Sequence, residues 1–343
     1  MDGIFALSSR VSAMAAVEAA VAMAQGAAGE IPSDAAAAIV AACSEPVGIE
    51  ILSDGWQVGT PVLGLLDALR LRLPGSAHQY LHHGLTTQDV VDTATMILAV
   101  DAVRHLDDLA GSAASSMRDI IRQFGSIATQ ARSFLQPADV TTVGFRTARW
   151  LDQLDHVRRR PSRTPVQLGG LIGDRMGISD AVADATATQL GLDDRLPWHT
   201  DRAPIIDLVT LVDDFARWAG KVGGDIAQLV QLGEITTRPG GSSAAAGKRN
   251  PIDAMRATAT AEVCLGVSTV ITHATPHEFE RGLGSWHAEW FALPLVFQTA
   301  GAAMEAIGAA LGSLDVEPSA LVVADDRRAA ADAYVTRVLE QSR

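Results

Sequence analysis

The chain has 343 residues, of which 48% are hydrophobic and 5% aromatic, and it carries a formal charge of -13. A chain of this length exceeds the size at which one hydrophobic core stops growing, so we expect more than one packed unit. Ala, Leu and Val must fill the interior, which favours closely packed helices over sheets. The acidic balance argues against nucleic acid or an anionic membrane surface as the main partner, because both need a basic face.

The cysteines and the first residues point to a reducing compartment. Cys43 and Cys264 are the only cysteines and stand in no metal-ligand spacing, so neither a disulfide framework nor a metal site is expected. The opening residues lack a basic leader, and no apolar stretch is expected to approach the roughly 20 residues that span a bilayer. The sequence therefore predicts a soluble, unexported, cytoplasmic protein.

Short helices are predicted in the N-terminal region, residues 1–80. Ser8 is expected to cap the first of them, and Thr60 followed by Pro61 is expected to open the third. The Pro74-Gly75 pair should end that third helix. The three predicted helices span residues 8–25, 32–43 and 62–73.

Long helices are predicted for the central region, residues 81–312. Thr86 and Asp89 fit a capping box, and an apolar stripe at helical spacing continues from there to Leu109. Comparable stretches span residues 140–156, 204–235, 251–274 and 285–311. Five such stretches predict an all-α bundle, followed by a short C-terminal helical region, 313–343, with its helix over 319–341. No period-two run demands a sheet, although short hairpins remain compatible with the pattern.

The segment 238–251 has the composition of a mobile loop. Between residues 239 and 247 it holds no large apolar side chain that could anchor it. A Gly-flanked pair, Ser242 and Ser243, beside fixed cations suits a lid that closes on an anion, whereas a plain Gly/Ser linker is the alternative. A phosphate-binding P-loop is excluded, because Ser242 and Arg249 stand where it needs a glycine and a hydroxyl. The groups that could bind a carboxylate at the end of the loop are Lys248, Arg249 and Asn250.

Five segments carry a resemblance to a known family. The loop Gly241-Ser-Ser-x-x-x-x-Lys-x-Asn-Pro251 resembles the signature loop of the fumarase/aspartase superfamily. Segment 82–89, His-His-Gly-Leu-Thr-Thr-Gln-Asp, is similar to its His-x-Gly-x-Thr-Ser-Gln-Asp motif, and segment 132–136, Arg-Ser-Phe-Leu-Gln, to its Arg-Thr-x-x-Gln segment. Segments 197–202 and 277–290 are similar to stretches typical of bacterial 3-carboxy-cis,cis-muconate cycloisomerases. The matches run in order from about residue 55 to 315.

The resemblance implies a chemistry in which a proton moves next to a carboxylate. It gives Ser242 the role of general base on a closing loop, with Lys248 favouring its alkoxide. Because Phe134 stands where many members carry a His, Ser242 and Lys248 are both candidates for the group that delivers the proton. Because the reaction passes through a doubly negative aci-carboxylate, cations and donors must converge on the carboxylate oxygens. No metal or organic cofactor is implied. The positions expected to bind the substrate are His82, Thr86, Thr87, Gln88, Arg132, Gln136, His199, Arg202, Ser243, Arg249, Asn250 and Arg281.

The chain departs from the superfamily pattern at two places. Phe134 and Met255 stand where many members carry a His–Glu pair, and bacterial carboxymuconate cycloisomerases resemble this chain there. Ala245, Ala246 and Gly247 replace Met-Pro and a polar residue in the loop, which should weaken its closed state by about 1 kcal/mol or more. The chain is also shorter than typical relatives at both ends, and the usual C-terminal domain is expected to be mostly absent.

The resemblance implies a homotetramer whose active sites combine motifs of different subunits. The implied reaction is attack of a carboxylate on the conjugated alkene of 3-carboxy-cis,cis-muconate, giving 4-carboxymuconolactone in aromatic catabolism. One alternative is a fumarate-releasing elimination of the adenylosuccinate type, against which Phe134 and Met255 speak. A second is a non-catalytic homologue that assembles with a full-length relative. The cluster of Trp286, His287 and Trp290 is expected to pack between helices rather than act chemically.

Overall fold

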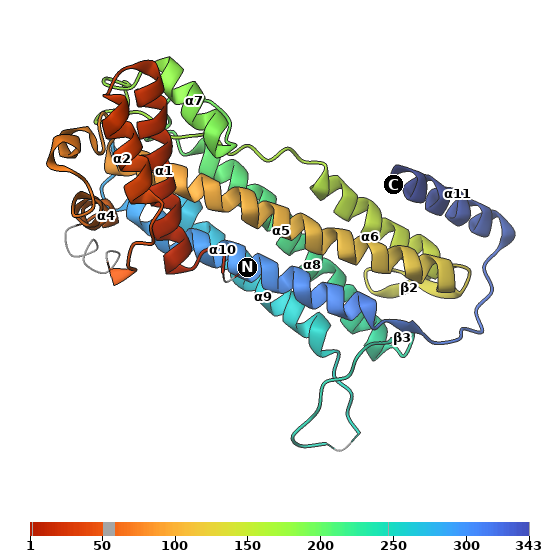
Figure 1. Ribbon diagram of the computed structural model, residues 1–343. Coiled ribbons are helices and arrows are strands. Elements are labelled where there is room, and N and C mark those ends of the chain that lie inside the picture. The colour runs from red at the N-terminus through yellow and green to blue at the C-terminus, as the bar shows by residue number, and fades with distance from the viewer. Residues whose placement is uncertain (2, 51–58, 246, 343) are drawn as a thin grey trace. The chain divides into compact units, whose positions relative to one another are not determined.

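Helices make up most of the chain in the computed structural model, which describes residues 1, 3–50, 59–245 and 247–342 (Figure 1). The all-α prediction is therefore confirmed. The helices are α1 (Leu7–Ala28), α2 (Ser33–Cys43), α4 (Pro61–Arg70), the 3-10 turn η1 (Gly75–Tyr80), α5 (Thr87–Phe124), α6 (Val143–Arg158), α7 (Asp180–Leu190), α8 (Ala203–Gln231), α9 (Ile252–Ala274), α10 (Ser285–Gly312) and α11 (Asp325–Gln341). The strands are β1 (Ala128–Ser133), β2 (Gln136–Thr142), β3 (Ile235–Thr236) and β4 (Asp315–Val316).

The chain divides into two compact units. Unit 1 comprises Met1–Val103, Ser162–Val209 and Val270–Pro294, and unit 2 comprises Arg104–Pro161, Thr210–Thr269 and Leu295–Arg343. In unit 1, α1 packs against α2 and α7; in unit 2, α11 packs against α6 and β2. The helices α5, α8, α9 and α10 contribute residues to both units. The sequence-based division at residues 80 and 312 stays a prediction.

The predicted start of α4 is confirmed, and that of α1 is wrong. Thr60 Oγ1 accepts a hydrogen bond of 3.2 Å from the Val62 amide, with Pro61 as the first helical residue. Ala6 occupies the cap position of α1 and has no side-chain cap bond. Ser8 lies inside the first turn of α1, so it lacks the extended backbone that a capping residue needs.

Two short antiparallel sheets in unit 2 correct the helix boundaries there. The pairing of β1 with β2 places residues 136–142 in a hairpin, and α6 begins only at Val143. Thr142 ends the strand and caps the helix, since its Oγ1 accepts a 3.1 Å bond from the Phe145 amide. β3 pairs with β4, so α8 ends at Gln231 rather than near 235. The last helix begins at Asp325 instead of 319.

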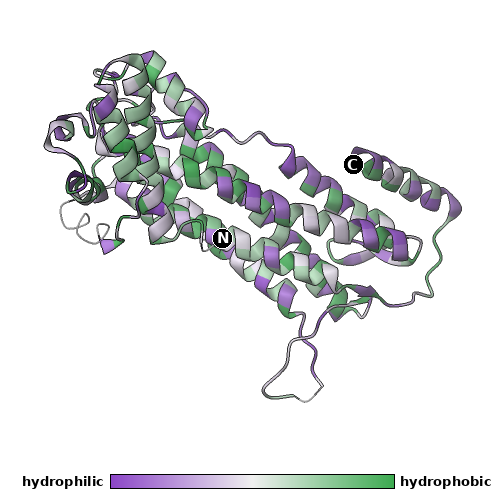
Figure 2. Ribbon diagram, viewed as in Figure 1, coloured by the Kyte–Doolittle hydropathy of each residue, from purple (hydrophilic) through white to green (hydrophobic). Residues whose placement is uncertain are grey.

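The core of each unit is apolar and contains few aromatic residues. Figure 2 shows α1 and α2 mainly in the colour of hydrophobic residues, which agrees with their Ala and Val content. The largest fully buried side chains are Ile39, Leu65, Leu69, Met96, Leu168 and Trp198 in unit 1, and Leu106, Met117, Leu151, Leu154, Phe215 and Phe297 in unit 2.

Two helices are long and apolar enough to span a membrane by length and composition alone, contrary to the expectation from the sequence. They are Leu7–Ala28 and Ser285–Gly312, and 61% and 56% of their most apolar windows are buried within the fold. A core helix of a soluble protein passes the same test, so this is weak support for a membrane span.

Candidate functional site

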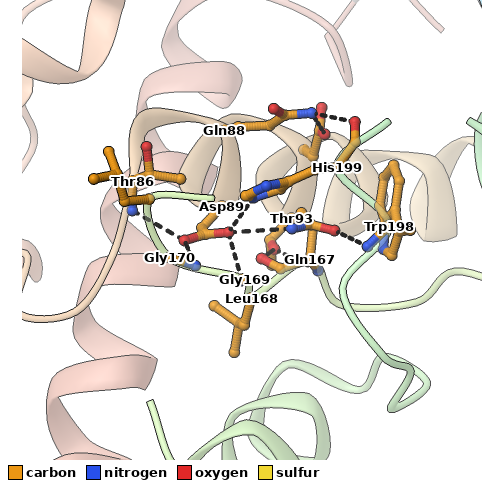
Figure 3. A network of polar contacts seen from close by, with 12 residues as sticks. Thr86, Gln88, Asp89, Thr93, Gln167, Leu168, Gly169, Gly170, Trp198 and His199 are labelled. Carbon is orange, nitrogen blue, oxygen red and sulfur yellow. Dashed lines mark hydrogen bonds and ion pairs between the residues drawn. The ribbon is translucent and has the colours of Figure 1, made fainter. Parts of the chain in front are cut away.

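A buried carboxylate, Asp89, organises the start of α5 (Figure 3). Its Oδ2 accepts a 2.9 Å bond from the Thr86 amide, which is the carboxylate half of the predicted capping box. Its five donors, at 2.8–3.2 Å, are the backbone amides of Thr86, Gly169 and Gly170 and the side chains of Gln167 and His199. The network fixes the backbone of the 82–89 motif against the loop that begins at residue 167.

His199 and Gln88 lie beside this carboxylate and are both buried. A Cβ added at Gly169 or Gly173 would come within 3.0 or 3.1 Å of a ring nitrogen of His199, so glycines let the backbone approach the ring. Gln88 Nε2 donates to the His199 carbonyl at 2.7 Å and to Asp92 at 3.1 Å. Both donors of the Gln88 amide are therefore used, while Gln88 Oε1 and His199 Nδ1 have no hydrogen-bond partner among the described residues.

Arg202 is fully engaged by the protein. It is 2% exposed, and its guanidinium lies 4.8 Å over the Trp198 ring. All five N–H groups donate: two bonds go to Asp92, two to Glu289 and one to the carbonyl of residue 199, at 2.5–3.2 Å. Burial opposes the charge, but the two carboxylates outweigh it and hold the pKa of Arg202 above its usual range. Trp286, from the cluster expected to pack between helices, donates to Asp92 at 2.9 Å.

Arg281 differs from Arg202 because only one of its nitrogens donates hydrogen bonds to the described residues. Its Nη2 donates to Thr86 Oγ1 at 2.7 Å and to the Leu171 carbonyl at 3.2 Å. Its Nε is buried without a partner in the part of the chain that the structure describes. Thr87 is adjacent in sequence to Thr86, and its Oγ1 lies 3.3 Å from Thr60 Oγ1. Arg281 and Thr86 thus form a polar pair with an unsatisfied donor.

His82 is paired with an acidic residue that the sequence reasoning missed. It adopts a left-handed backbone, φ 62°, and its Nδ1 lies 2.6 Å from Glu18 Oε1. Burial alone would lower the pKa of His82, but the hydrogen bond and charge of Glu18 outweigh it and raise that pKa. Gln25, also on α1, donates to the His83 carbonyl at 2.9 Å. The sequence does contain a signal for this partner: Glu18 is the only charged residue between 11 and 29, so it stands alone in an apolar helix.

The 238–251 loop of unit 2 is fastened at its base and extends beyond it (Figure 1). Gly240 and Asn250 exchange two backbone hydrogen bonds, of 2.7 and 3.2 Å, and Asn250 Nδ2 donates to the Gly241 carbonyl at 2.9 Å. Arg238 forms a two-pronged ion pair of 2.6 and 3.0 Å with Asp253, in the first turn of α9. The ends of the loop are therefore held while its tip is exposed.

The hydroxyl of Ser242 receives backbone donors from its own loop. Ser242 Oγ accepts from the Ala245 amide at 3.2 Å and from the Ala244 amide at 3.4 Å. Two amides aimed at one oxygen favour a developing alkoxide there. Ala246, part of the departure in this loop, lies outside the described residues. The other predicted site residues at the tip are exposed, namely Ser243, Lys248 and Arg249.

The hairpin of β1 and β2 carries the second predicted segment of unit 2. Arg132 forms an ion pair with Glu234, and its guanidinium outweighs the burial of that carboxylate to lower the pKa of Glu234. Gln136 is exposed at the start of β2, where it pairs with Ser133 next to the hairpin tip. The positions of the missing His–Glu pair are open to solvent, since Phe134 is 98% exposed and Met255 50% exposed.

The predicted site residues thus form two groups, one in each unit. Unit 1 brings together His82, Thr86, Thr87, Gln88, His199, Arg202 and Arg281, and unit 2 holds Arg132, Gln136, Ser242, Ser243, Lys248, Arg249 and Asn250. Within the described ranges no three His, Cys, Asp or Glu side chains could hold a metal ion together. The sequence reasoning missed the acidic partners Glu18, Asp92, Glu234 and Glu289.

Comparison with known proteins identifies the family. Residues 1–266 match the Lyase family model. The chain is 31% identical to a 3-carboxy-cis,cis-muconate cycloisomerase of Pseudomonas aeruginosa, over 90% of this chain and 72% of that protein. It is also 31% identical to a nitrosuccinate lyase of Streptomyces davaonensis, over 94% of this chain and 72% of that protein. The crystal structure of the 3-carboxy-cis,cis-muconate lactonizing enzyme of Pseudomonas putida is 29% identical and superposes with a TM-score of 0.85, covering 99% of this chain and 77% of that one. The chain therefore belongs to the lyase family of the fumarase/aspartase superfamily, among relatives that include 3-carboxy-cis,cis-muconate cycloisomerases.

Proposed function

We propose that the chain is a cycloisomerase that converts 3-carboxy-cis,cis-muconate to 4-carboxymuconolactone during aromatic catabolism in the cytoplasm. The observation that carries the proposal is the geometry of Ser242, whose hydroxyl accepts hydrogen bonds from two backbone amides on an exposed loop that also carries Lys248. The identity of 31% to a protein with this activity supports the choice of reaction.

In the proposed reaction Ser242 moves the proton. A substrate carboxylate attacks the conjugated alkene, which forms the C–O bond of the lactone and leaves an aci-carboxylate. Ser242 Oγ gives its proton to the carbon next to that carboxylate, and the amides of Ala244 and Ala245 with the Lys248 cation stabilise the alkoxide. The same group acts as base in the reverse elimination, as microscopic reversibility requires.

The unit 1 residues bind and orient the substrate in this proposal. Arg281 contacts a carboxylate through its Nη1 group, which has no hydrogen bond to any described residue, while its Nη2 already positions Thr86. Arg202 does not contact the substrate, because all five of its N–H groups are used by the protein. Its role is to hold Asp92 and Glu289, and through Asp92 the Gln88 side chain.

The proposal includes a homotetramer with active sites shared between subunits. Support comes from the exposure of groups that a single chain leaves uncovered, among them Phe134 at 98% and Leu135 at 68% on the hairpin tip. The mass of one chain is 36.0 kDa, and light scattering coupled to gel filtration should give four times this value. A monomeric mass in an active preparation would contradict the shared site.

The test of Ser242 uses its neighbour as a matched control. Lactonisation destroys the conjugated diene, so ultraviolet absorbance of the substrate reports turnover. Ser242→Ala should lower turnover at least a hundredfold with the oligomer intact, whereas Ser243→Ala should reduce it far less, because only Ser242 Oγ receives the two amides. Near-normal turnover by the Ser242→Ala variant would contradict the proposed role of Ser242 in proton transfer.

A second candidate is an elimination from a substituted succinate that releases fumarate. The observation that favours it is the 31% identity to a nitrosuccinate lyase over 94% of this chain. Fumarate formation from a panel of substituted succinates, without lactone formation from the muconate, would favour this candidate. Binding of a nucleoside monophosphate would favour the adenylosuccinate type among these eliminations.

A further inference from the structure

Unit 2 contains an open cavity of about 320 Å³ between α6, α8 and β1. Its walls carry an unusual concentration of cations for a chain of charge -13. The basic side chains that line it are Arg132, Arg146, Arg149 and Lys221.

The carboxylates at this cavity do not balance the cations. Asp225 lines it and pairs with Lys221 at 2.5 Å. Glu234 lies next to it and is shared by Arg132 and Arg146. Four cations against these two carboxylates leave an excess of two positive charges. Arg149 has no ion pair with any described residue, and its side chain is exposed to the cavity opening.

Hydrogen bonds fix the position of the Arg146 guanidinium, and its partial burial disfavours the charged form. Its Nη1 donates to Thr129 Oγ1 and its Nη2 to the Gln130 carbonyl, both at 2.8 Å. Only 21% of its side chain is exposed, and burial lowers its pKa despite the nearby Glu234. A partly buried cation in a region of excess positive charge is stabilised when an anion binds beside it.

The uncharged lining is mainly apolar and aromatic, with the polar side chains of Thr141, Gln153 and Gln228 among it, and this mixture favours an organic anion over a bare inorganic one. Lys221 Nζ lies 5.7 Å from the Trp150 ring, and the Arg149 guanidinium lies 6.0 Å from the Phe145 ring. Leu229 adds an aliphatic surface. Such a mixture suits a ligand that joins several carboxylates through a short carbon skeleton.

We propose that this cavity binds a small organic polycarboxylate through Arg146, Arg149 and Lys221. The ligand has two possible sources, a substrate or product of the enzyme itself or a separate effector of the same chemistry. The excess positive charge and the lining of this cavity are the same whether or not the chain performs the proposed reaction.

The first experiment measures binding of tricarballylate, an unreactive tricarboxylate, by calorimetry to the full chain. The double variant Arg149→Gln/Lys221→Gln should bind at least tenfold more weakly than wild type. The control double variant Arg159→Gln/Arg337→Gln removes the same charge from two exposed positions of unit 2 outside the cavity and should bind like wild type. Equal binding by both double variants, or no binding by wild type, would overturn the proposal. Equally tight binding of inorganic phosphate would overturn the selection of an organic anion.

A kinetic measurement then separates the two sources. A raised KM for 3-carboxy-cis,cis-muconate with unchanged kcat in Arg149→Gln/Lys221→Gln identifies the ligand as the substrate. Unchanged KM and kcat, together with lost tricarballylate binding, identify an effector. Binding of tricarballylate should persist in Ser242→Ala. If wild type shows no turnover but binds tricarballylate in a way that depends on Arg149 and Lys221, the proposed function fails and the cavity assignment stands.

Discussion

Substitution of Asp89 by Asn tests whether the buried carboxylate holds the motif in place. The Asp89 oxygens accept five hydrogen bonds, three at Oδ1 and two at Oδ2. An Asn side chain has only one acceptor oxygen. It keeps the most hydrogen bonds when this oxygen takes the place of Oδ1, so that its NH₂ group replaces Oδ2 and faces the Thr86 and Gly170 amides. Two bonds to a charged group are then lost, each worth about 1.5–3 kcal/mol, so the variant should be destabilised by about 3–6 kcal/mol.

The assay combines unfolding with hydrogen exchange. Because the chain has two units, a single unfolding free energy is not well defined, and exchange of peptides covering 84–90 and 167–172 localises the effect. These peptides should exchange faster in Asp89→Asn than in wild type, and the thermal midpoint should fall. The control is Asp174→Asn in the same loop: Asp174 is exposed and accepts one bond, of 3.1 Å, from the Met176 amide. Its cost should stay within about 0.5 kcal/mol.

Unchanged exchange in both peptides of Asp89→Asn would refute the reasoning. So would a fall in thermal midpoint no larger than that of Asp174→Asn. Either result would mean that the hydrogen bonds to Asp89 are replaced at little cost.

Two further predictions concern buried ion pairs of unit 1. Arg202→Lys supplies three donors for five and leaves Asp92 or Glu289 short of partners. It should lower the local opening free energy around residue 88 by about 3 kcal/mol, measured by native-state hydrogen exchange. A fall below about 1 kcal/mol would contradict the positioning role. Glu18→Gln should lower the pKa of His82, measured by NMR titration. Since the folded-state pKa is raised, charging of His82 stabilises wild type fully below its ordinary pKa of about 6.5, and this gain disappears as pH rises through the folded pKa. The variant should lack the gain at acidic pH, and identical pH profiles would exclude the pairing.

The helices could be predicted because their signal is local. Apolar residues at helical spacing locate α8, α9 and α10 to within a few residues, and Thr60 caps α4 as its sequence predicts. The start of α5 is also located, but its predicted stripe stops at Leu109 although the helix continues to Phe124. The boundaries that failed depend on pairing partners. Residues 136–142 form a strand because β1 is available, and α8 ends early because residue 235 pairs with residue 316. No local pattern encodes such partners.

The family and its motifs could also be predicted, and the comparisons confirm both the family and the bundle. The partners of the motif residues could not. Arg202 contacts Asp92, 110 residues away, and Glu289, 87 residues away, and only the fold shows that these carboxylates consume its donors. Glu18 reaches His82 across 64 residues for the same reason. The sequence therefore identifies the charged and polar residues of the motifs. It does not show which of these residues are bound by other parts of the protein and which remain available to a ligand.

The measurement that tests the central claim most directly is the NMR spectrum of the product formed from 3-carboxy-cis,cis-muconate in D₂O. We expect 4-carboxymuconolactone with one deuterium on the carbon next to the carboxylate, because the Ser242 hydroxyl exchanges with solvent before it gives its proton to that carbon. Unreacted muconate at high protein concentration, or fumarate from a substituted succinate in place of any lactone, would contradict the cycloisomerase assignment.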